Sequence, residues 1–400
     1  MSSGYELHQK LRTKTVRQVK KKQYNEAIST LHSGSLDLLS QSEQGSACDL
    51  ALYMIDVYAI SNVAVDSESR DRITDILDKA APDFWRKKVI DAAVKWSVKA
   101  TGASTGDPLL RLWIGKMYAK QGDFEHAEPH FLAACVVTEQ TYAVESAPKA
   151  YANAMVEWLA KFAQKAAEQE GETRNADAIQ RIEAGRFALR ATIPLLANHA
   201  VNQAITFQET YLTQVTKSQK SLLLPVTPNP RPYVPPGSPT PSTTTTTTTT
   251  NNSNLQLYLT ANPDLNFSQM AVALVFESNK LGATSRTPDW LRNAWINLVR
   301  QYEREAPALM HEEGVRAAIP QIGAEWFGLQ QPRNQGNMLS DMMASLFGGS
   351  GGAGSEQGQG KQQQQIKAGA PPRPMASTTT ATAATQSSTA ADDLVDDEMD

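Results

Sequence analysis

The chain has only two cysteines, Cys48 and Cys135, and neither belongs to a Cys-x-x-Cys pair. Disulfide frameworks and structural zinc sites need more thiols at closer spacing, so the sequence predicts neither and favours a reducing compartment. No stretch approaches the roughly 20 consecutive apolar residues of a membrane-spanning helix, and the first residues lack the apolar run of a signal peptide. We therefore expect a cytosolic protein that does not insert into membranes.

A strong charge of one sign is also lacking. The 38 lysines and arginines nearly balance the 42 aspartates and glutamates, which leaves a formal net charge of −4. Such a balance does not favour binding to nucleic acid or to acidic membranes. The charges are nevertheless segregated along the chain, and this favours charged docking faces for other proteins.

Residue patterns for catalysis are scarce. The six histidines are scattered along the chain and do not form the convergent group of titratable residues that a catalytic site needs. His311-Glu312-Glu313 begins like the zinc-protease motif His-Glu-x-x-His, but position 315 is valine. The segment 358–362, Gly-Gln-Gly-Lys-Gln, lacks the serine or threonine of a phosphate-binding loop. We expect no enzymatic activity, no cofactor and no metal.

What the chain does contain is helical periodicity, most clearly over residues 109–134. Gly122-Asp123-Phe124 separates two helical stretches in which small and large residues alternate in a fixed order: Gly115, Tyr118, Ala127, Phe131 and Ala134. Small residues let two helix backbones approach closely, and the large ones fill the space beside them. The order is typical of a tetratricopeptide repeat, although Arg111 replaces its tryptophan. One such hairpin needs neighbours on both faces.

Similar spacing predicts further helices through most of the chain. Residues 7–22 show an apolar side next to a basic stripe of Lys10, Lys14, Arg17 and Lys21, and the segment around Tyr24 repeats the later turn more weakly. Ser46 is expected to cap a third helix and Pro82 to begin another, with a charged connection at 63–72 between them. Helices are also expected at 143–169, 176–203 with a kink at Pro194, 204–215, 267–277, 289–305 and 308–327.

Two apolar segments depart from this pattern. Residues 221–226 and 255–259 have the composition or alternation of strands, and a Pro/Thr-rich insertion, 227–253, lies between them. We expect an antiparallel hairpin with a disordered loop. Residues 337–347 form an amphipathic, methionine-rich stretch that either covers the chain's own last helices or meets a partner. The acidic, low-complexity residues 348–400 are expected to be disordered.

The sequence thus predicts an all-α fold, a TPR-like α-solenoid of stacked helical hairpins with a small β-hairpin inserted in its C-terminal half. We expect one solenoid half over residues 1–140 and a second, with the hairpin, over 141–347.

In addition, the chain resembles the Golgi to ER traffic protein 4 family over most of 24–347. The matching marks occur in one order: Tyr24-x-Glu26-Ala27, Gly34 with Leu38, Gln44-Gly45-Ser46-x-x-Asp49-Leu50, Asp56-Val57-Tyr58, Gly106-Asp107-Pro108, Gly115 with Gly122-Asp123-Phe124, Asp264-Leu265-Asn266-Phe267, and Asp341-Met342-Met343 before Leu346-Phe347-Gly348-Gly349. The insertion and the long C-terminal tail depart from the family pattern.

This resemblance implies a cytosolic scaffold of the guided-entry pathway for tail-anchored membrane proteins, working as part of a hetero-oligomer. Its N-terminal half would dock the targeting ATPase through Lys10, Lys14, Arg17 and Tyr24, with Asp66, Glu68 and Asp71 near the edge of that face. Its C-terminal half would hold an adaptor with a ubiquitin-like domain through Leu255, Leu257, Leu259, Leu265, Phe267, Met342 and Met343.

A different binding class stays open as an alternative, namely a TPR-type cochaperone that clamps short C-terminal peptide tails. Such a protein needs several consecutive repeats with a groove lined by lysine and asparagine. Only residues 109–134 fit the repeat well.

Overall fold

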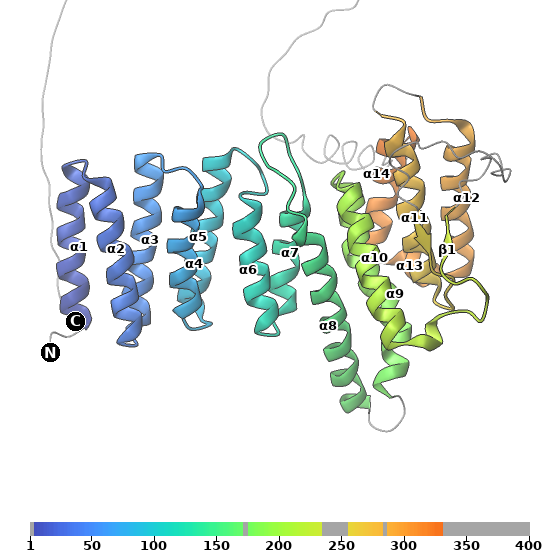
Figure 1. Ribbon diagram of the computed structural model, residues 1–400, viewed down its shortest axis with the longest axis horizontal. Coiled ribbons are helices and arrows are strands. Elements are labelled where there is room, and N and C mark those ends of the chain that lie inside the picture. Colours follow the sequence, from blue (N-terminus) through green and yellow to red (C-terminus); the bar gives the residue numbers. More distant parts are fainter. Residues whose placement is uncertain (1–3, 171–174, 234–254, 283–285, 331–400) are drawn as a thin grey trace, which may run out of the picture. The chain divides into compact units, whose positions relative to one another are not determined.

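The computed structural model describes residues 4–170, 175–233, 255–282 and 286–330, and these are almost entirely helical. The all-α prediction is confirmed. Figure 1 shows the helices following one another in chain order. The helices are α1 (Gly4–Lys20), α2 (Tyr24–Ser40), α3 (Gln44–Ser61), α4 (Ser67–Lys79), α5 (Phe84–Thr101), α6 (Pro108–Lys120), α7 (Phe124–Cys135), α8 (Ser146–Glu170), α9 (Ala176–Ala197), α10 (Val201–Ser218), α11 (Pro263–Lys280), α12 (Asp289–Glu305), α13 (Pro307–His311) and α14 (Glu313–Phe327).

Packing follows the chain order, as expected for stacked hairpins. Helix α1 packs on α2, α2 on α3 and α6 on α7, while α8, α9 and α10 pack on one another. Helix α9 also contacts α11 and α14, which brings the last described helix back against the middle of the chain. Each hairpin therefore buries against its neighbours the apolar surface that an isolated hairpin would leave exposed.

One turn geometry recurs between paired helices. Lys22, Ser42, Gly122 and His199 each have a positive φ, between 57° and 80°. In each case the next residue donates its backbone N–H to a carbonyl five residues earlier, as from Asp123 to Tyr118 at 3.0 Å. These hydrogen bonds pair backbone carbonyls that have no partner within the helix, because the helix ends there. The predicted echo of the 122–127 turn near Tyr24 is confirmed, although glycine occupies only one of the four positions.

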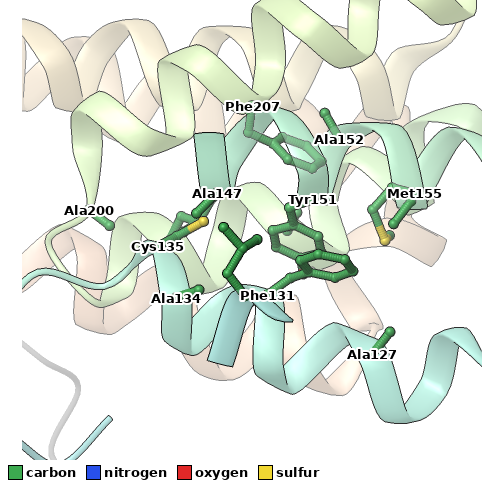
Figure 2. Close-up of a cluster of buried hydrophobic side chains, with 14 of the residues drawn as sticks. Ala127, Phe131, Ala134, Cys135, Ala147, Tyr151, Ala152, Met155, Ala200 and Phe207 are labelled. Carbon is green, nitrogen blue, oxygen red and sulfur yellow. The ribbon is translucent and has the colours of Figure 1, made fainter. Parts of the chain in front are cut away.

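The central hairpin of α6 and α7 has the packing predicted from its small residues. A Cβ added at Gly115 would lie 3.1 Å from the Phe131 ring, so this glycine permits close contact between the helices. Figure 2 shows the Phe131 ring beside Tyr151 of α8, with Phe207 of α10 above them. The ring centroids are 5.7 Å apart for Phe131–Tyr151 and 5.1 Å for Tyr151–Phe207. Three helices, α7, α8 and α10, thus share one aromatic core.

Several predicted boundaries were wrong. The connection predicted at 63–72 becomes helix from Ser67, because Asp66 and Ser69 form a reciprocal cap. Helix α3 begins at Gln44 without a side-chain cap, so Ser46 is not its cap. Asp83, not Pro82, begins α5, since its carboxylate accepts the N–H groups of Trp85 and Arg86.

Two longer helices also differ from the prediction. Pro194 lies within the last turn of α9, which ends at Ala197 instead of continuing to residue 203. The expected helix at 308–327 is divided into α13 and α14 by Glu312. Two of the tryptophans, Trp85 and Trp290, are 39% and 41% exposed.

The predicted antiparallel strand pair is present, but its first strand lies at residues 231–232 and not at 221–226. Strand β1 (Arg231–Pro232) pairs antiparallel with β2 (Gln256–Leu257), with Arg231 opposite Leu257. The predicted first strand, 221–226, contributes a 3-10 turn (Lys220–Leu222) and an isolated bridge from Leu223 to Thr260. Residues 234–253, most of the predicted disordered insertion, lie outside the described residues, as do the methionine-rich stretch and the tail at 348–400.

Candidate functional site

Helix α1 presents the predicted basic stripe to solvent. Lys10, Lys14, Arg17 and Lys21 are all exposed. They line a groove of about 640 Å³ that is formed entirely by α1 and the turn after it, together with Gln9, Thr13, Gln18 and Gln23. The neutral lining residues donate and accept hydrogen bonds but carry no negative charge. The groove therefore offers a positive face to an acidic surface.

The opposite side of α1 is held by the chain itself. Thr15 is fully buried, and Leu11 fills the space left by Gly34 of α2, where a Cβ would come within 2.5 Å of it. Near the start of α1, His8 Nε2 lies 2.8 Å from the Asp49 carboxylate of α3, and Arg12 bonds the same carboxylate. These contacts fix the rotation of α1, so the stripe faces outward.

Tyr24 and the predicted acidic edge belong to different helices, α2 and α4. Tyr24 is half-buried at the start of α2, directly after the basic turn. Asp66 caps α4, and the Ser69 backbone N–H lowers the pKa of its carboxyl. Glu68 pairs with Arg72, and Asp71 is exposed. Helix α4 packs on α2, α5 and α6, whereas α1 packs on α2 and α3, so helix α2 separates the acidic cluster from the stripe.

A second candidate surface is the segment 255–260, which two side-chain amides hold in place. Gln269 of α11 accepts the Tyr258 N–H at 2.7 Å and donates to the Tyr258 carbonyl at 2.9 Å. Asn229 does the same for Leu259, at 3.0 Å and 2.9 Å. Both backbone groups of each residue are thus paired without a regular sheet.

Of the predicted adaptor-binding residues, three belong to the chain's own core. Leu255 is 3% exposed, and Leu265 and Phe267 are fully buried. The prediction that these three contact a partner was wrong, because a buried side chain cannot meet another protein without unfolding its surroundings. Leu257 and Leu259 are half-buried and remain available. Met342 and Met343 lie outside the described residues.

Sequence reasoning missed the residues that orient this surface. Gly185 of α9 lies where α11 begins, and a Cβ there would be 2.4 Å from Cβ of Asp264 and 2.6 Å from the Leu265 nitrogen. Asn262 caps α11 and donates its amide to the carbonyls of Arg181 and Ile182 at 2.8 Å and 3.0 Å. The Asn-Pro sequence at 262–263 was the available signal for this cap.

The described residues lack membrane-spanning helices and clusters of metal ligands. None of their helices is long and apolar enough to cross a membrane. They also contain no cluster of three histidine, cysteine or carboxylate side chains suited to a metal ion.

Comparison with known proteins decides the family. The model of the family described as Golgi to ER traffic protein 4 matches residues 21–347, which is most of the chain. The chain belongs to the Golgi to ER traffic protein 4 family. The resemblance stated from the sequence is therefore confirmed, and the protein is placed in Golgi-to-ER traffic. Residues 10–17 of the basic stripe lie just before the matched range.

Individual relatives agree with this family. Golgi to ER traffic protein 4 of Schizosaccharomyces pombe is 25% identical over 346 residues, covering 86% of this chain and 91% of the relative. The Aspergillus fumigatus protein of that name is 25% identical over 367 residues, covering 88% and 87%. The crystal structure of C. therm. Get4 has a TM-score of 0.63 at 24% identity, covers 86% of this chain and 90% of its own, and supports the fold.

Proposed function

We propose that this Golgi to ER traffic protein 4 family member is a cytosolic, non-enzymatic scaffold that bridges two proteins. One is the targeting ATPase for tail-anchored membrane proteins, and the other is an adaptor with a ubiquitin-like domain. By holding both, the scaffold promotes the handover of tail-anchored proteins for insertion into the endoplasmic reticulum. The family match supports the traffic pathway, and the two surfaces described above support the bridging role.

The basic stripe is the proposed ATPase-docking surface. Lys10, Lys14 and Arg17 project from a helix whose other side is fixed by Asp49 and Gly34, so the charges are presented on a rigid support. Ion pairs across such a face govern the rate and orientation of association more than the final affinity. Tyr24 lies at the end of the stripe and supplies an aromatic contact. Asp66, Glu68 and Asp71 are proposed as a separate contact on α4.

The segment 255–259 is the proposed adaptor-docking surface. Leu257 and Leu259 are half-buried. The backbone N–H of Leu224 donates to the Leu259 carbonyl, and Leu224 and Val226 are 41% and 37% exposed. These aliphatic side chains form a small apolar strip suited to the apolar face of a folded domain. Met342 and Met343, outside the described residues, are proposed to complete the contact.

The observation that carries the bridging role is that the two surfaces share no helix. The stripe belongs to α1, which packs on α2 and α3, whereas the strip is tied to α11 and to residues 222–233. Both partners can therefore bind without competing for a residue. Tethering them on one chain raises the effective concentration of one near the other.

The test is to mix the full chain with the ATPase and the adaptor and to measure complexes by size-exclusion chromatography with light scattering. We expect one complex that contains all three proteins. Lys14→Glu with Arg17→Glu should remove only the ATPase, and Leu257→Asp with Leu259→Asp only the adaptor. If either double variant loses both partners while remaining folded, or if the two partners exclude each other, the bridging proposal is wrong.

A further inference from the structure

One arginine of the central hairpin has no acidic partner. Arg111 lies in the first turn of α6, at the position where the tetratricopeptide pattern has tryptophan, and it is half-buried. Its Nε–H donates to the Thr105 carbonyl at 2.7 Å, and its Nη1 donates to Nδ1 of His130 on α7 at 3.3 Å. Within the described part of the chain, no carboxylate forms an ion pair with this guanidinium.

The half-buried arginines of α4 show the usual arrangement. Arg70 pairs with Asp107 at 3.4 Å, and Arg72 pairs with Glu68. At Arg111, by contrast, burial lowers the pKa of the guanidinium and no neighbouring charge raises it. A charge withdrawn from water without a counter-ion is costly, so a carboxylate that binds there offsets part of this cost.

The unused donors at this place are accessible. Because an arginine can only donate, its bond to Nδ1 puts the proton of the neutral His130 ring on Nε2. Arg111 Nη2 and His130 Nε2 have no hydrogen-bond partner among the described residues, and both reach solvent. The Tyr118 ring stacks on the His130 ring, with centroids 5.9 Å apart, and limits its movement. Two neighbouring side chains therefore offer N–H groups without an acceptor.

The charges of this region select an anion with a single charge. Burial first, and then Arg111 and His126, lower the pKa of His130 to about 4, so its ring is neutral near pH 7. His126 is paired with Asp123 at 2.8 Å, and Arg86 is 4% exposed and therefore out of reach of a partner. One accessible positive charge matches one carboxylate, whereas a doubly charged phosphate would keep a charge without a partner. The planar guanidinium also fits a carboxylate in shape.

An exposed aromatic ring lies near the same end of the hairpin. Tyr142, in the loop after α7, is 51% exposed. Burial first, and then Asp107, raise its pKa while Arg70 lowers it, which places the ring near the start of α6. Helix α6 begins and α7 ends at this end of the hairpin (Figure 1). Arginine and tyrosine are enriched among the residues that dominate the binding energy of protein interfaces. The pair favours a carboxylate carried by a protein surface.

We propose that Arg111 and His130, with Tyr142 at their edge, form a docking surface for a partner protein that presents an aspartate or glutamate side chain. The carboxylate accepts N–H groups from Arg111 and His130, and the tyrosine ring packs on the partner beside it. This surface shares no residue with the basic stripe of α1 or with the segment 255–259. It therefore adds a contact to the proposed bridging function and does not depend on it.

The test titrates the full chain with the peptide acetyl-Ala-Glu-Ala-amide and follows the NMR signals of the Arg111 Nε–H group and of the His130 ring. Both signals should shift at millimolar concentration. The matched peptide acetyl-Ala-Gln-Ala-amide has the same shape without the charge and should bind about tenfold more weakly or less, as expected for a charge-assisted hydrogen bond. Acetate should compete with the glutamate peptide, and inorganic phosphate should compete no better than acetate.

Matched variants separate the site from the net charge of the chain. Arg111→Gln should abolish the shift of the His130 ring, and His130→Asn should weaken the glutamate peptide about two- to tenfold. Arg111→Lys keeps the charge without the planar fork and should give an intermediate affinity, which preserves the test if Arg111→Gln does not fold. Arg316→Gln removes one exposed positive charge from α14 and, as the control, should leave the affinity unchanged.

Three results would overturn the proposal. The first is equal binding of the glutamate and glutamine peptides, or the absence of a shift at Arg111 when the protein is folded. The second is competition by phosphate at a much lower concentration than acetate, which would assign the site to phosphorylated ligands. The third is an equal loss of affinity in Arg111→Gln and Arg316→Gln, which would reduce the effect to net charge.

Discussion

The side-chain amide of Gln269 pairs with both backbone groups of Tyr258, accepting its N–H at 2.7 Å and donating to its carbonyl at 2.9 Å. Gln269 is 2% exposed, so these bonds form away from water. One buried side chain on α11 thereby fixes the segment that carries Leu257 and Leu259. The proposed adaptor surface depends on a helix residue that does not itself face the adaptor.

Gln269→Leu should therefore release this segment. The substitution leaves the Tyr258 backbone groups without partners, and we expect the free energy of unfolding to fall by about 1–3 kcal/mol. Adaptor affinity should fall while ATPase binding is kept. Urea unfolding and binding by calorimetry measure the two effects. Gln214→Leu is the control, since Gln214 bonds only the exposed Asn153 side chain, and a comparable loss there would contradict the assigned role.

Gly185→Ala should disturb the joint between α9 and α11. The new methyl group would lie 2.4 Å from Asp264 Cβ and 2.6 Å from the Leu265 backbone nitrogen, which cannot move without shifting α11. Overpacking of this kind costs about 1–3 kcal/mol. Gly314→Ala has open space at its Cβ and should be neutral or stabilising. Thermal unfolding of both variants checks this, and equal melting temperatures would show that the joint is more tolerant than its geometry indicates.

The stripe on α1 should act through its charge. Lys14→Glu combined with Arg17→Glu should slow association with the ATPase, and the unmodified protein should lose association rate as salt is raised from low to high concentration. Both side chains are exposed, so stability should change by less than about 0.5 kcal/mol. Lys116→Glu with Lys120→Glu on α6 makes the same charge change elsewhere. Association rates are measured by stopped flow. If they fall equally in both double variants, the effect is one of net charge alone.

His130 should make stability depend on pH. Burial first, and then Arg111 and His126, lower the pKa of His130 to about 4 in the folded chain. The unfolded chain, with a histidine pKa near 6.5, binds the proton more readily, so the stabilisation is present above about pH 6.5 and is lost as pH falls toward 4. Between pH 7.5 and pH 5 the loss should be about 2 kcal/mol.

Urea unfolding at the two pH values measures this effect, and His130→Asn should reduce the difference by about the same amount. His32, whose pKa is also lowered by burial, contributes in the same direction in both proteins and so does not alter the comparison. An unchanged difference in the variant would assign the pH dependence to other groups.

The candidate site could be predicted only in part. The three- and four-residue spacing of Lys10, Lys14 and Arg17 was enough to place them on one outward face, because a helix fixes those directions locally. Leu265 and Phe267 were wrongly assigned to a docking surface. An apolar residue that follows a predicted strand can contact either a partner protein or the chain's own core, and the sequence pattern is the same in both cases. Only the packing of α9 on α11 distinguishes these two cases.

By itself the sequence determined the all-α class, the family and the central hairpin, because periodicity and the small residues Gly115 and Ala127 act over short distances along the chain. The tertiary structure decided the strand register and the burial of Leu255, Leu265 and Phe267. It also decided the hydrogen bonds of Gln269 to Tyr258 and the close contact of α9 with α11 at Gly185. These depend on contacts between residues far apart in sequence, such as Asn262 with Arg181, and no local pattern records which distant groups meet. Local periodicity selects helices, but the match of shapes and hydrogen bonds between helices selects which side chains remain at the surface.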